Sequence, residues 1–378
     1  MGHKLLVSHM KAIQENINIL SEKIKELSSW NKARVFVLVG LMVAIIEKRS
    51  VNLKKLATFI NPKYSLKTNY RRITRFFQKF KFEEKVFAKI LSSFLPDEKW
   101  ILIMDRTNWK FGRVDINFLV LSVAYKGIAI PLLWNTLKEN KKGNSNYNNR
   151  IEIMEKFINI FGKKKIKALL ADREFIGKEW FKYLKKENIP FIIRVRNNIK
   201  VNERKLKDLF KGLNIGFTIK YPKKIKLFEY EDLNIEALRN FKGELVIVAT
   251  NIGNVEAIKL YKKRWEIETM FSAFKTRGFN LEETHMQDLN KLSLLFGIIS
   301  LSFVWCYHIG IQRAKVKPIK VLKHGFKEKS YFMYGVELLS ALFTNSSYNA
   351  KKIKIVFDFF ISIIESIPIK LSILKKAF

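Results

Sequence analysis

The alternation of apolar and polar positions changes character twice along the chain, near residue 95 and again near residue 285. Residues 1–95 carry the three-to-four-residue period of amphipathic helices. Residues 96–284 alternate short apolar runs with amphipathic stretches, which is typical of an α/β domain. Residues 285–378 are again helical and apolar. The pattern therefore predicts an α/β protein with an all-helical N-terminal domain and a helical C-terminal region.

Several short apolar runs of the middle domain read as strands. Two of them are separated only by Lys126-Gly127, which is a hairpin spacing. Helices are predicted over 151–161 and 178–187, and the polar stretch 135–149 is predicted to be a mobile loop. Short strands alternate with turns from about 197 to 250, so a β-rich insertion is expected there. The predicted strands are 100–104, 117–125, 128–134, 166–171, 191–195, 217–221, 225–230 and 245–250.

Two of these strands end on an aspartate. Asp105 follows the run 100–104, and Asp172 follows the run 166–171. Because adjacent strands lie about 4.8 Å apart, two such aspartates on neighbouring strands could share a pair of cations. Taken singly, either aspartate could instead be a helix cap or a turn residue.

A third acidic residue lies in a patterned segment further along the chain. Tyr261, Arg264, Glu268 and Lys275 are spaced by 3, 4 and 7 residues. On one helix turning about 100° per residue, these side chains fall within roughly 60° of one another. The alternative is a surface helix with i,i+4 ion pairs. Three nearby carboxylates repel one another without cations, and all-oxygen ligands favour Mg²⁺ or Mn²⁺, so we expect the glutamate and the two aspartates to form a metal site.

Net charge indicates the partner. The chain has 71 Lys+Arg against 34 Asp+Glu, which gives +37. Such an excess favours binding to a polyanion, and nucleic acid fits best. The codon bias of an AT-rich genome would explain many lysines, but it does not explain the shortage of acids. The single Cys306 excludes an internal disulfide framework and a cysteine-based zinc site.

The N-terminal domain contains a candidate DNA reader. A short amphipathic helix over 50–60 is broken at Asn61-Pro62 and followed by a basic helix over 66–80. Two short helices joined by such a turn are compatible with a helix-turn-helix-like reader, while a plain helical subdomain with solvated lysines is the alternative. The candidate contacts to a DNA end are Lys67, Arg71, Arg72, Arg75 and Lys79.

The three acidic residues and the Tyr/Arg/Glu/Lys pattern resemble those of a known family. Asp105, Asp172 and Glu268 resemble the acidic triad of the DDE transposases. The pattern Tyr-x2-Arg-x3-Glu-x6-Lys is similar to the signature of one bacterial insertion-sequence group, family four, which includes cut-and-paste elements. The resemblance spans about residues 100–310. The matching contexts are Met104-Asp-Arg-Thr-Asn-Trp109, Leu170-Ala-Asp-Arg-Glu-Phe175 and residues 261–275.

The resemblance implies a fold and a mechanism. The fold would be an RNase H-like core in which the two aspartate strands are adjacent, with the β-rich insertion before the glutamate helix. Two Mg²⁺ ions, for which Mn²⁺ can substitute, would be held by the triad. The activity would be cleavage at transposon ends and strand transfer into target DNA, with a hairpin intermediate as one option. Tyr261, Arg264 and Lys275 would bind a DNA phosphate near the cut.

The resemblance also implies partners. These are double-stranded DNA, as terminal inverted repeats and as target, and a second copy of the chain in a synaptic complex assembled with the C-terminal region. Relatives hold a flipped base on an aromatic of the insertion, often a tryptophan. No tryptophan occurs between Trp180 and Trp265. Tyr221, Phe228 and Tyr230 are the candidates for this role, although aromatics on short strands are more often core residues.

The first thirty residues are charged throughout, and the most apolar stretch, 292–307, is short for a membrane span. We expect a cytoplasmic, nucleoid-associated protein without a membrane partner. Two other functions stay open: an RNase H-like structure-specific nuclease that only hydrolyses DNA, and a non-catalytic DNA-binding repressor derived from a transposase. The complete acidic triad argues against the repressor.

Overall fold

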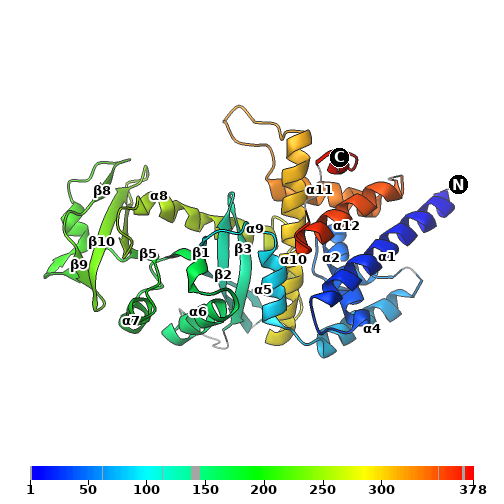
Figure 1. Ribbon diagram of the computed structural model, residues 1–378, viewed down its shortest axis with the longest axis horizontal. Coiled ribbons are helices and arrows are strands. Elements are labelled where there is room, and N and C mark those ends of the chain that lie inside the picture. Colours follow the sequence, from blue (N-terminus) through cyan, green and yellow to red (C-terminus); the bar gives the residue numbers. More distant parts are fainter. Residues whose placement is uncertain (1, 62, 113, 138–144, 348, 368–370) are drawn as a thin grey trace. The chain divides into compact units, whose positions relative to one another are not determined.

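The computed structural model describes residues 2–61, 63–112, 114–137, 145–347, 349–367 and 371–378 (Figure 1). The chain divides into two compact units. The sheet unit consists of Asp97–Lys110 and Val114–Met270. The helical unit consists of Met1–Pro96, Phe111–Arg113 and Phe271–Phe378.

One sheet dominates the sheet unit. Its strands are β1 (Trp100–Phe111), β2 (Val114–Tyr125), β3 (Ile128–Thr136), β4 (Ile166–Ala171), β5 (Phe191–Val195), β8 (Thr218–Lys220), β9 (Ile225–Leu227), β10 (Tyr230–Arg239) and β11 (Leu245–Thr250). Across the described residues their order is β3-β2-β1-β4-β5-β11-β10-β8, with β9 paired to β10. β4 runs parallel to both β1 and β5, and β11 runs antiparallel to β5.

The first five strands build the core that positions the acids. After β3 the chain forms α6 (Tyr147–Phe161), β4, α7 (Lys178–Lys186) and then β5. Parallel strands joined through helices are buried on both faces, which explains their nearly continuous apolar runs. The predicted fold class, an α/β RNase H-like core with helices before and after it, is confirmed. The aspartate strands β1 and β4 are neighbours, as the resemblance implied.

Some predicted boundaries differ from the structure. β1 continues beside β2 to Phe111, although its pairing with β4 ends at Met104, so Asp105 lies inside a strand and not at its end. The loop predicted over 135–149 is shorter at both sides, because β3 reaches Thr136 and Asn146 caps α6. Residues 138–144 of that loop lie outside the described residues.

The predicted insertion adds strands to the same sheet. β11 pairs with β5, β10 pairs with β11, and β8 lies at the edge. The prediction of one strand over 225–230 is wrong, because Phe228 and Glu229 adopt positive φ values of 51° and 63° and turn the chain from β9 into β10. Before these strands come a small hairpin of β6 (Lys200–Val201) and β7 (Arg204–Lys205) and a 3-10 turn, η2 (Leu206–Phe210).

Helices from both ends of the chain form the helical unit. α1 packs on α2 and α12, and α2 packs on α10 and α11, so the N-terminal and C-terminal helices share one core. Side chains of Asn31, Ser65, Asp288 and Ser330 accept backbone N–H groups at helix starts. The helices are α1 (Gly2–Glu26), α2 (Lys32–Lys48), α3 (Leu53–Ala57), α4 (Leu66–Lys79), α5 (Glu84–Ser92), α10 (Leu289–Val316), α11 (Tyr331–Thr344), α12 (Ala350–Ile364) and α13 (Leu371–Leu374).

α10 is the central helix of this unit. Within the described ranges it is the one helix long and apolar enough to cross a membrane, and 94% of its apolar segment is buried inside the structure. A core helix passes the same test of length and composition. Gly310 of α10 and Gly335 of α11 allow the two backbones to touch, because a Cβ built at Gly310 would lie 1.8 Å from the carbonyl oxygen of Tyr331.

Candidate active site

Two aspartates lie side by side where the parallel pairing of β1 and β4 ends. The register of β1 and β4 places Met104 opposite Ala171. Asp105 is the residue after Met104, and Asp172 is the residue after Ala171. The apolar residues before them are buried. The backbone of the sheet, about 4.8 Å between strands, therefore brings the two carboxylates together.

The third acid enters from α9. The segment forms α8 (Ala257–Tyr261), a 3-10 turn η3 (Lys262–Arg264) and α9 (Trp265–Phe274), so it is not the continuous helix that was predicted. A 3-10 turn advances about 120° per residue instead of 100°, which rotates Tyr261 relative to Glu268. Tyr261 still contacts Asp172, and Glu268 is connected to Asp105 through Arg264.

The guanidinium of Arg264 joins two of the acids. Its Nη1 donates to Oδ2 of Asp105 at 2.9 Å, and its Nη2 donates to Oε1 of Glu268 at 2.7 Å. The hydroxyl of Tyr261 donates to Oδ1 of Asp172 at 3.3 Å. The Arg264 side chain is 7% exposed, so its charge is largely removed from water. Tyr261 therefore contacts one of the three acids, Asp172, and Arg264 contacts the other two.

The electrostatics of the cluster are dominated by burial. Burial raises the pKa of the Asp105 carboxyl to about 7. Attraction by Arg264 opposes this rise in pKa, and repulsion by Glu174 and Asp172 adds to it. Burial also acts to lower the pKa of Arg264, but the neighbouring hydroxyl and carboxyl groups raise that pKa above its ordinary value. The arginine therefore stays charged.

A bidentate ion pair connects the middle of β1 to the segment that follows β4. Nε and Nη2 of Arg106 donate to Oε1 and Oε2 of Glu174, each at 2.7 Å. Arg106 follows Asp105, and Glu174 lies two residues beyond Asp172. A planar fork on a carboxylate fixes orientation as well as distance. The pair therefore holds the two aspartates in register just beyond the sheet pairing.

Arg150 fixes the loop that follows Asp172. It lies on the first turn of α6 and is 5% exposed. Its Nη2 donates to the backbone carbonyls of Ser145 at 2.5 Å and of Glu174 at 3.0 Å, and its Nη1 donates to that of Ile176 at 3.2 Å. Burial lowers its pKa to about 10, so it is charged at neutral pH. Sequence reasoning missed this residue because the helix was predicted to begin after it.

Arg194 is a second residue that sequence reasoning missed. Its Nη1 lies 3.8 Å from Oδ1 of Asp172, and its Nη2 donates to Oε1 of Glu244 at 2.5 Å. This hydrogen bond lowers the pKa of Glu244. A lone arginine in the buried strand Phe-Ile-Ile-Arg-Val was the available signal.

Comparison with known proteins identifies the domain. A family model described as the transposase DDE domain matches residues 96–305, more than half of the chain. The chain belongs to this transposase family. Transposases of this kind typically have catalytic activity and generally use divalent metal ions. The predicted resemblance is confirmed at this level, and assignment to the family-four group stays a prediction.

No curated protein matches this transposase. Among solved structures, it is similar to a piggyBac transposase synaptic complex with hairpin DNA, determined by cryo-EM. The identity is 12%, the match covers 92% of this chain and 76% of that chain, and the TM-score is 0.45.

Lys275, the last residue of the predicted stripe, lies outside the regular helix. α9 ends at Phe274, and Nζ of Lys275 lies 2.9 Å from Oε1 of Glu282 in the helical unit. Its predicted contact with a DNA phosphate stays a prediction.

The three acids have the ligand chemistry of a divalent-cation site, but their present arrangement does not form one. All three offer carboxylate oxygens, and the raised pKa of Asp105 means that its charge is incompletely compensated. Among the residues that the structure describes, no three His, Cys, Asp or Glu side chains form a group that could hold a metal ion. Arg264 offers a reason, because its guanidinium bridges Asp105 and Glu268. A cation shared by these two carboxylates would have to replace it.

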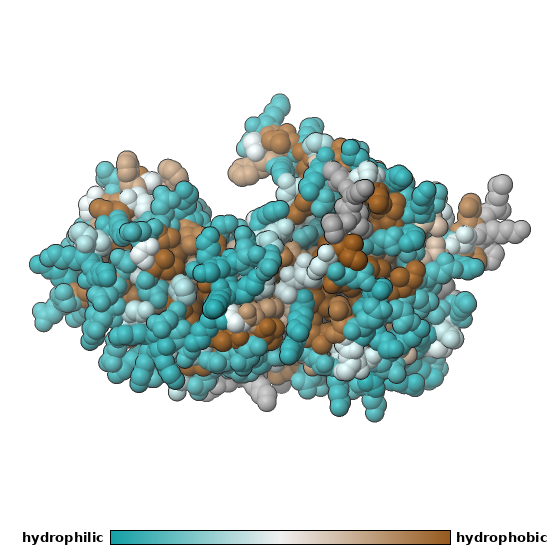
Figure 2. Space-filling model, in the orientation of Figure 1, coloured by the Kyte–Doolittle hydropathy of each residue, from teal (hydrophilic) through white to brown (hydrophobic). Residues whose placement is uncertain are grey.

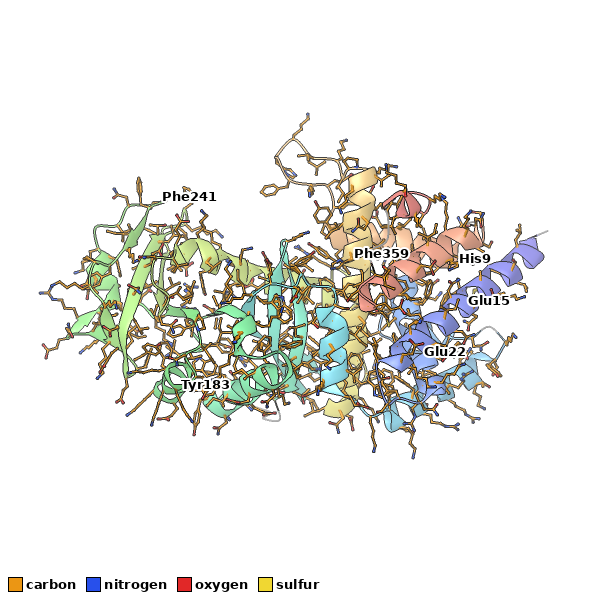
Figure 3. The ribbon with its side chains drawn as sticks, in the orientation of Figure 1. His9, Glu15, Glu22, Tyr183, Phe241 and Phe359 are labelled. Atoms are coloured by element: carbon orange, nitrogen blue, oxygen red, sulfur yellow. The ribbon has the colours of Figure 1, made fainter. Side chains whose placement is uncertain are left out.

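The aromatic residues proposed to hold a base are already packed. Tyr221, Phe228 and Tyr230 each lie against another aromatic ring, with centroid distances of 6.2, 5.0 and 5.5 Å. Two other aromatics of the insertion are free of such packing, since Phe217 is 64% exposed and Phe241 is 90% exposed. Figure 3 shows Phe241 pointing away from the strands.

The candidate DNA-end contacts lie on α4. Ile73, Phe76 and Phe77 are buried on one side of this helix. The guanidinium of Arg72 lies 5.0 Å from the centroid of the Tyr64 ring. The remaining candidates are exposed and spaced four residues apart, so they form one basic stripe: Lys67, Arg71, Arg75 and Lys79.

Proposed function

We propose that this transposase cuts DNA at the ends of a mobile element and joins the freed 3′ ends to target DNA. Asp105, Asp172 and Glu268 would be the catalytic acids. The observation that carries the proposal is the hydrogen-bonded cluster of these acids with Tyr261 and Arg264. Buried ion pairs are rarely needed for stability, and perturbed, buried charges concentrate at functional sites.

Divalent ions are part of the proposal. Two Mg²⁺ ions held by the acids, or Mn²⁺ in their place, would activate the attacking water or DNA 3′-OH and stabilise the leaving oxygen. The protein would contribute positioning and charge, as in phosphoryl transfer generally. Assembly as a homodimer on paired terminal inverted repeats, location in the cytoplasm with the nucleoid and the absence of a membrane partner belong to the same proposal.

Tyr261, Arg264 and Lys275 would bind a phosphate of the non-transferred strand. A guanidinium donates to phosphate oxygens as readily as to carboxylates, so Arg264 can exchange the acids for DNA. Burial and the nearby Asp172 raise the pKa of Tyr261, so its hydroxyl keeps its proton and remains a donor at neutral pH. The spacing of these residues supports family four and its cut-and-paste chemistry, in which a hairpin intermediate is one option.

Substitution of the acids tests the proposal. Asp105→Asn, Asp172→Asn and Glu268→Gln should each abolish Mg²⁺- or Mn²⁺-dependent cleavage of duplexes bearing the element's terminal repeats, while DNA affinity is largely retained. Glu256→Gln is the matched control, since it removes the same charge from an exposed acid at the start of α8. Cleavage by Asp172→Asn at the wild-type rate would reject the triad and make Glu174 the next candidate.

The same assay separates the rival functions. Cleaved ends that carry a 3′-OH should be joined to a labelled target duplex. Hydrolysis without joining would indicate a structure-specific nuclease. Binding without cleavage in either metal would indicate a repressor.

A further inference from the structure

Between α10 and α11 the chain forms a closed loop, residues 317–330, which we name the basic hairpin. Val321 forms a β-bridge with Lys327, and the N–H of Glu328 donates to the carbonyl of Lys320 at 2.8 Å. Two further main-chain hydrogen bonds of 2.9 Å close the turn around Gly325, whose φ of 82° favours glycine. The backbone is therefore built as a hairpin and is not a loose connection.

The base of the basic hairpin is anchored to α11. The hydroxyl of Tyr334 donates to the carbonyl of Lys317 at 3.1 Å. The guanidinium of Arg313 lies 3.9 Å from the Tyr334 ring centroid, and Nζ of Lys327 lies 3.9 Å from that of Tyr331. Figure 1 shows the hairpin extending from the end of α10, uppermost in the view. These contacts with Tyr331 and Tyr334 of α11 fix the position of the hairpin relative to α10.

The basic hairpin and the last turn of α10 together concentrate uncompensated charge. Residues 315–329 contain six lysines and a single acid, Glu328. Lys329 forms an ion pair with Glu337 at 2.8 Å. Four other lysines are exposed, and within the described part of the chain none of them forms an ion pair: Lys315, Lys317, Lys320 and Lys323. Like charges held together on a fixed backbone repel, so an external polyanion would relieve this repulsion.

An apolar tip accompanies the lysines. Phe326 is 73% exposed and Val321 is 59% exposed. The ring of His324 lies 5.5 Å from the ring of Phe326, centroid to centroid, which leaves most of the phenyl surface to solvent. In Figure 2, brown atoms lie among the teal ones on this loop. A free aromatic ring between cations is the arrangement that stacks on nucleic-acid bases without sequence preference.

We propose that the basic hairpin is a DNA-binding element. Its lysines contact phosphates, and Phe326 rests against a base or a base step at the tip. The inference rests on the proposed function only in taking DNA as the partner. An anionic lipid surface is a poorer match, because membrane-surface elements need a broad apolar face and the hairpin offers only Phe326 and Val321.

The basic hairpin and α4 lie at opposite ends of α10. Thr74 and Phe77 of α4 line a cavity of about 330 Å³ together with Asp288 and Lys291 at the start of α10. α10 has 28 residues, which corresponds to about 42 Å or roughly 12 base pairs along a duplex. The hairpin is therefore a surface separate from the stripe on α4, and a duplex that contacted both would be covered over more than one helical turn.

The test uses the full chain in EDTA, so that binding is measured without cleavage. Fluorescence anisotropy with a mixed-sequence duplex of about 40 base pairs gives the affinity between about 50 and 300 mM salt. A triple variant replaces Lys317, Lys320 and Lys323 by glutamine. Its slope of log K against log salt should be smaller than that of the wild type by up to about 2.7, since each phosphate contact contributes about 0.9. The control replaces three exposed lysines of α7 by glutamine and should keep the wild-type slope: Lys182, Lys185 and Lys186.

A second variant separates stacking from charge. Phe326→Ala should weaken binding about fivefold or more and leave the salt slope unchanged. The proposal would be overturned if the hairpin triple variant and the α7 control lost DNA affinity equally. It would also be overturned if the hairpin variants lost binding to phosphatidylserine vesicles and kept their binding to DNA. A wild type that binds no duplex would overturn the proposed function as well, whereas binding that the hairpin variants leave unchanged overturns this inference alone. Circular dichroism melts check that the variants fold.

Discussion

Asp105→Asn should stabilise the metal-free protein at neutral pH while it removes activity. The Asp105 carboxyl is buried, and its pKa is raised from 3.8 to about 7. Asparagine has the shape of the protonated carboxyl and carries no charge. The substitution therefore removes the free-energy cost of ionising this group inside the protein, and the remaining contact of Arg264 with Glu268 keeps the guanidinium paired.

The size of the effect follows from the shift in pKa. Between about pH 4 and pH 7 the folded protein holds a proton on Asp105 that the unfolded chain has released, so wild-type stability falls as pH rises through this window and is level above it. A rise of about three pKa units corresponds to about 4 kcal/mol. The free energy of unfolding of Asp105→Asn should thus exceed that of the wild type by little at pH 4 and by about 4 kcal/mol above pH 7.

Denaturant unfolding in EDTA, at several values from about pH 5 to pH 8, measures this difference. The advantage of Asp105→Asn should grow by about 1.4 kcal/mol per pH unit up to pH 7. Glu244→Gln is a control of opposite sign, because the hydrogen bond from Arg194 lowers the pKa of Glu244. That stabilisation is fully present above about pH 4.5, so this variant should show a constant deficit. A difference between Asp105→Asn and the wild type that does not change with pH would refute the reasoning.

Two further predictions concern DNA. Arg264→Ala and Lys275→Ala should impair cleavage far more than Lys262→Ala or Lys263→Ala, because the last two side chains are exposed. Lys263 lies 3.9 Å from Glu266, which is not one of the three proposed catalytic acids. Equal losses in a salt-matched assay would mean that the pattern has no special role. In the full chain, replacing the α4 arginines by alanine should remove most of the preference for terminal over random duplex and lower the salt slope by up to about 2.7. A wild type without that preference would move recognition to another surface. The arginines are Arg71, Arg72 and Arg75.

The strands of the core could be predicted because burial on both faces leaves continuous apolar runs. The bounds of β5 and β11 agree with the prediction to the residue. β10 was not predicted as a strand, because it carries Glu231, Asp232 and Glu236 among its apolar residues. Glu236 is tolerated inside because it accepts the N–H of Ala257 at 2.6 Å, a contact across 21 residues that no local pattern contains.

Most features of the site that could not be predicted from the sequence are contacts between residues far apart along the chain. Arg106 and Glu174 are 68 residues apart, and Arg264 and Asp105 are 159 apart. A period of three to four residues can place Arg264 and Glu268 on one side of a helix, but it cannot say that the guanidinium reaches a strand. The shared core of α1 and α12 likewise joins the two ends of the chain. Such contacts depend on the sheet order and helix packing, which the resemblance supplied only in part.

The same contacts distinguish a binding site from a structural ion pair. A structural pair is stable when every donor and acceptor is satisfied, since each buried group left without a partner costs free energy. Nε of Arg264 is buried without a hydrogen-bond partner among the described residues, and the carboxyl of Asp105 resists ionisation. The surrounding sheet and the Arg106–Glu174 pair hold these groups in place in spite of that cost. The proposed function would give each of these two groups a partner from outside, a phosphate for the guanidinium and a cation for the carboxylate.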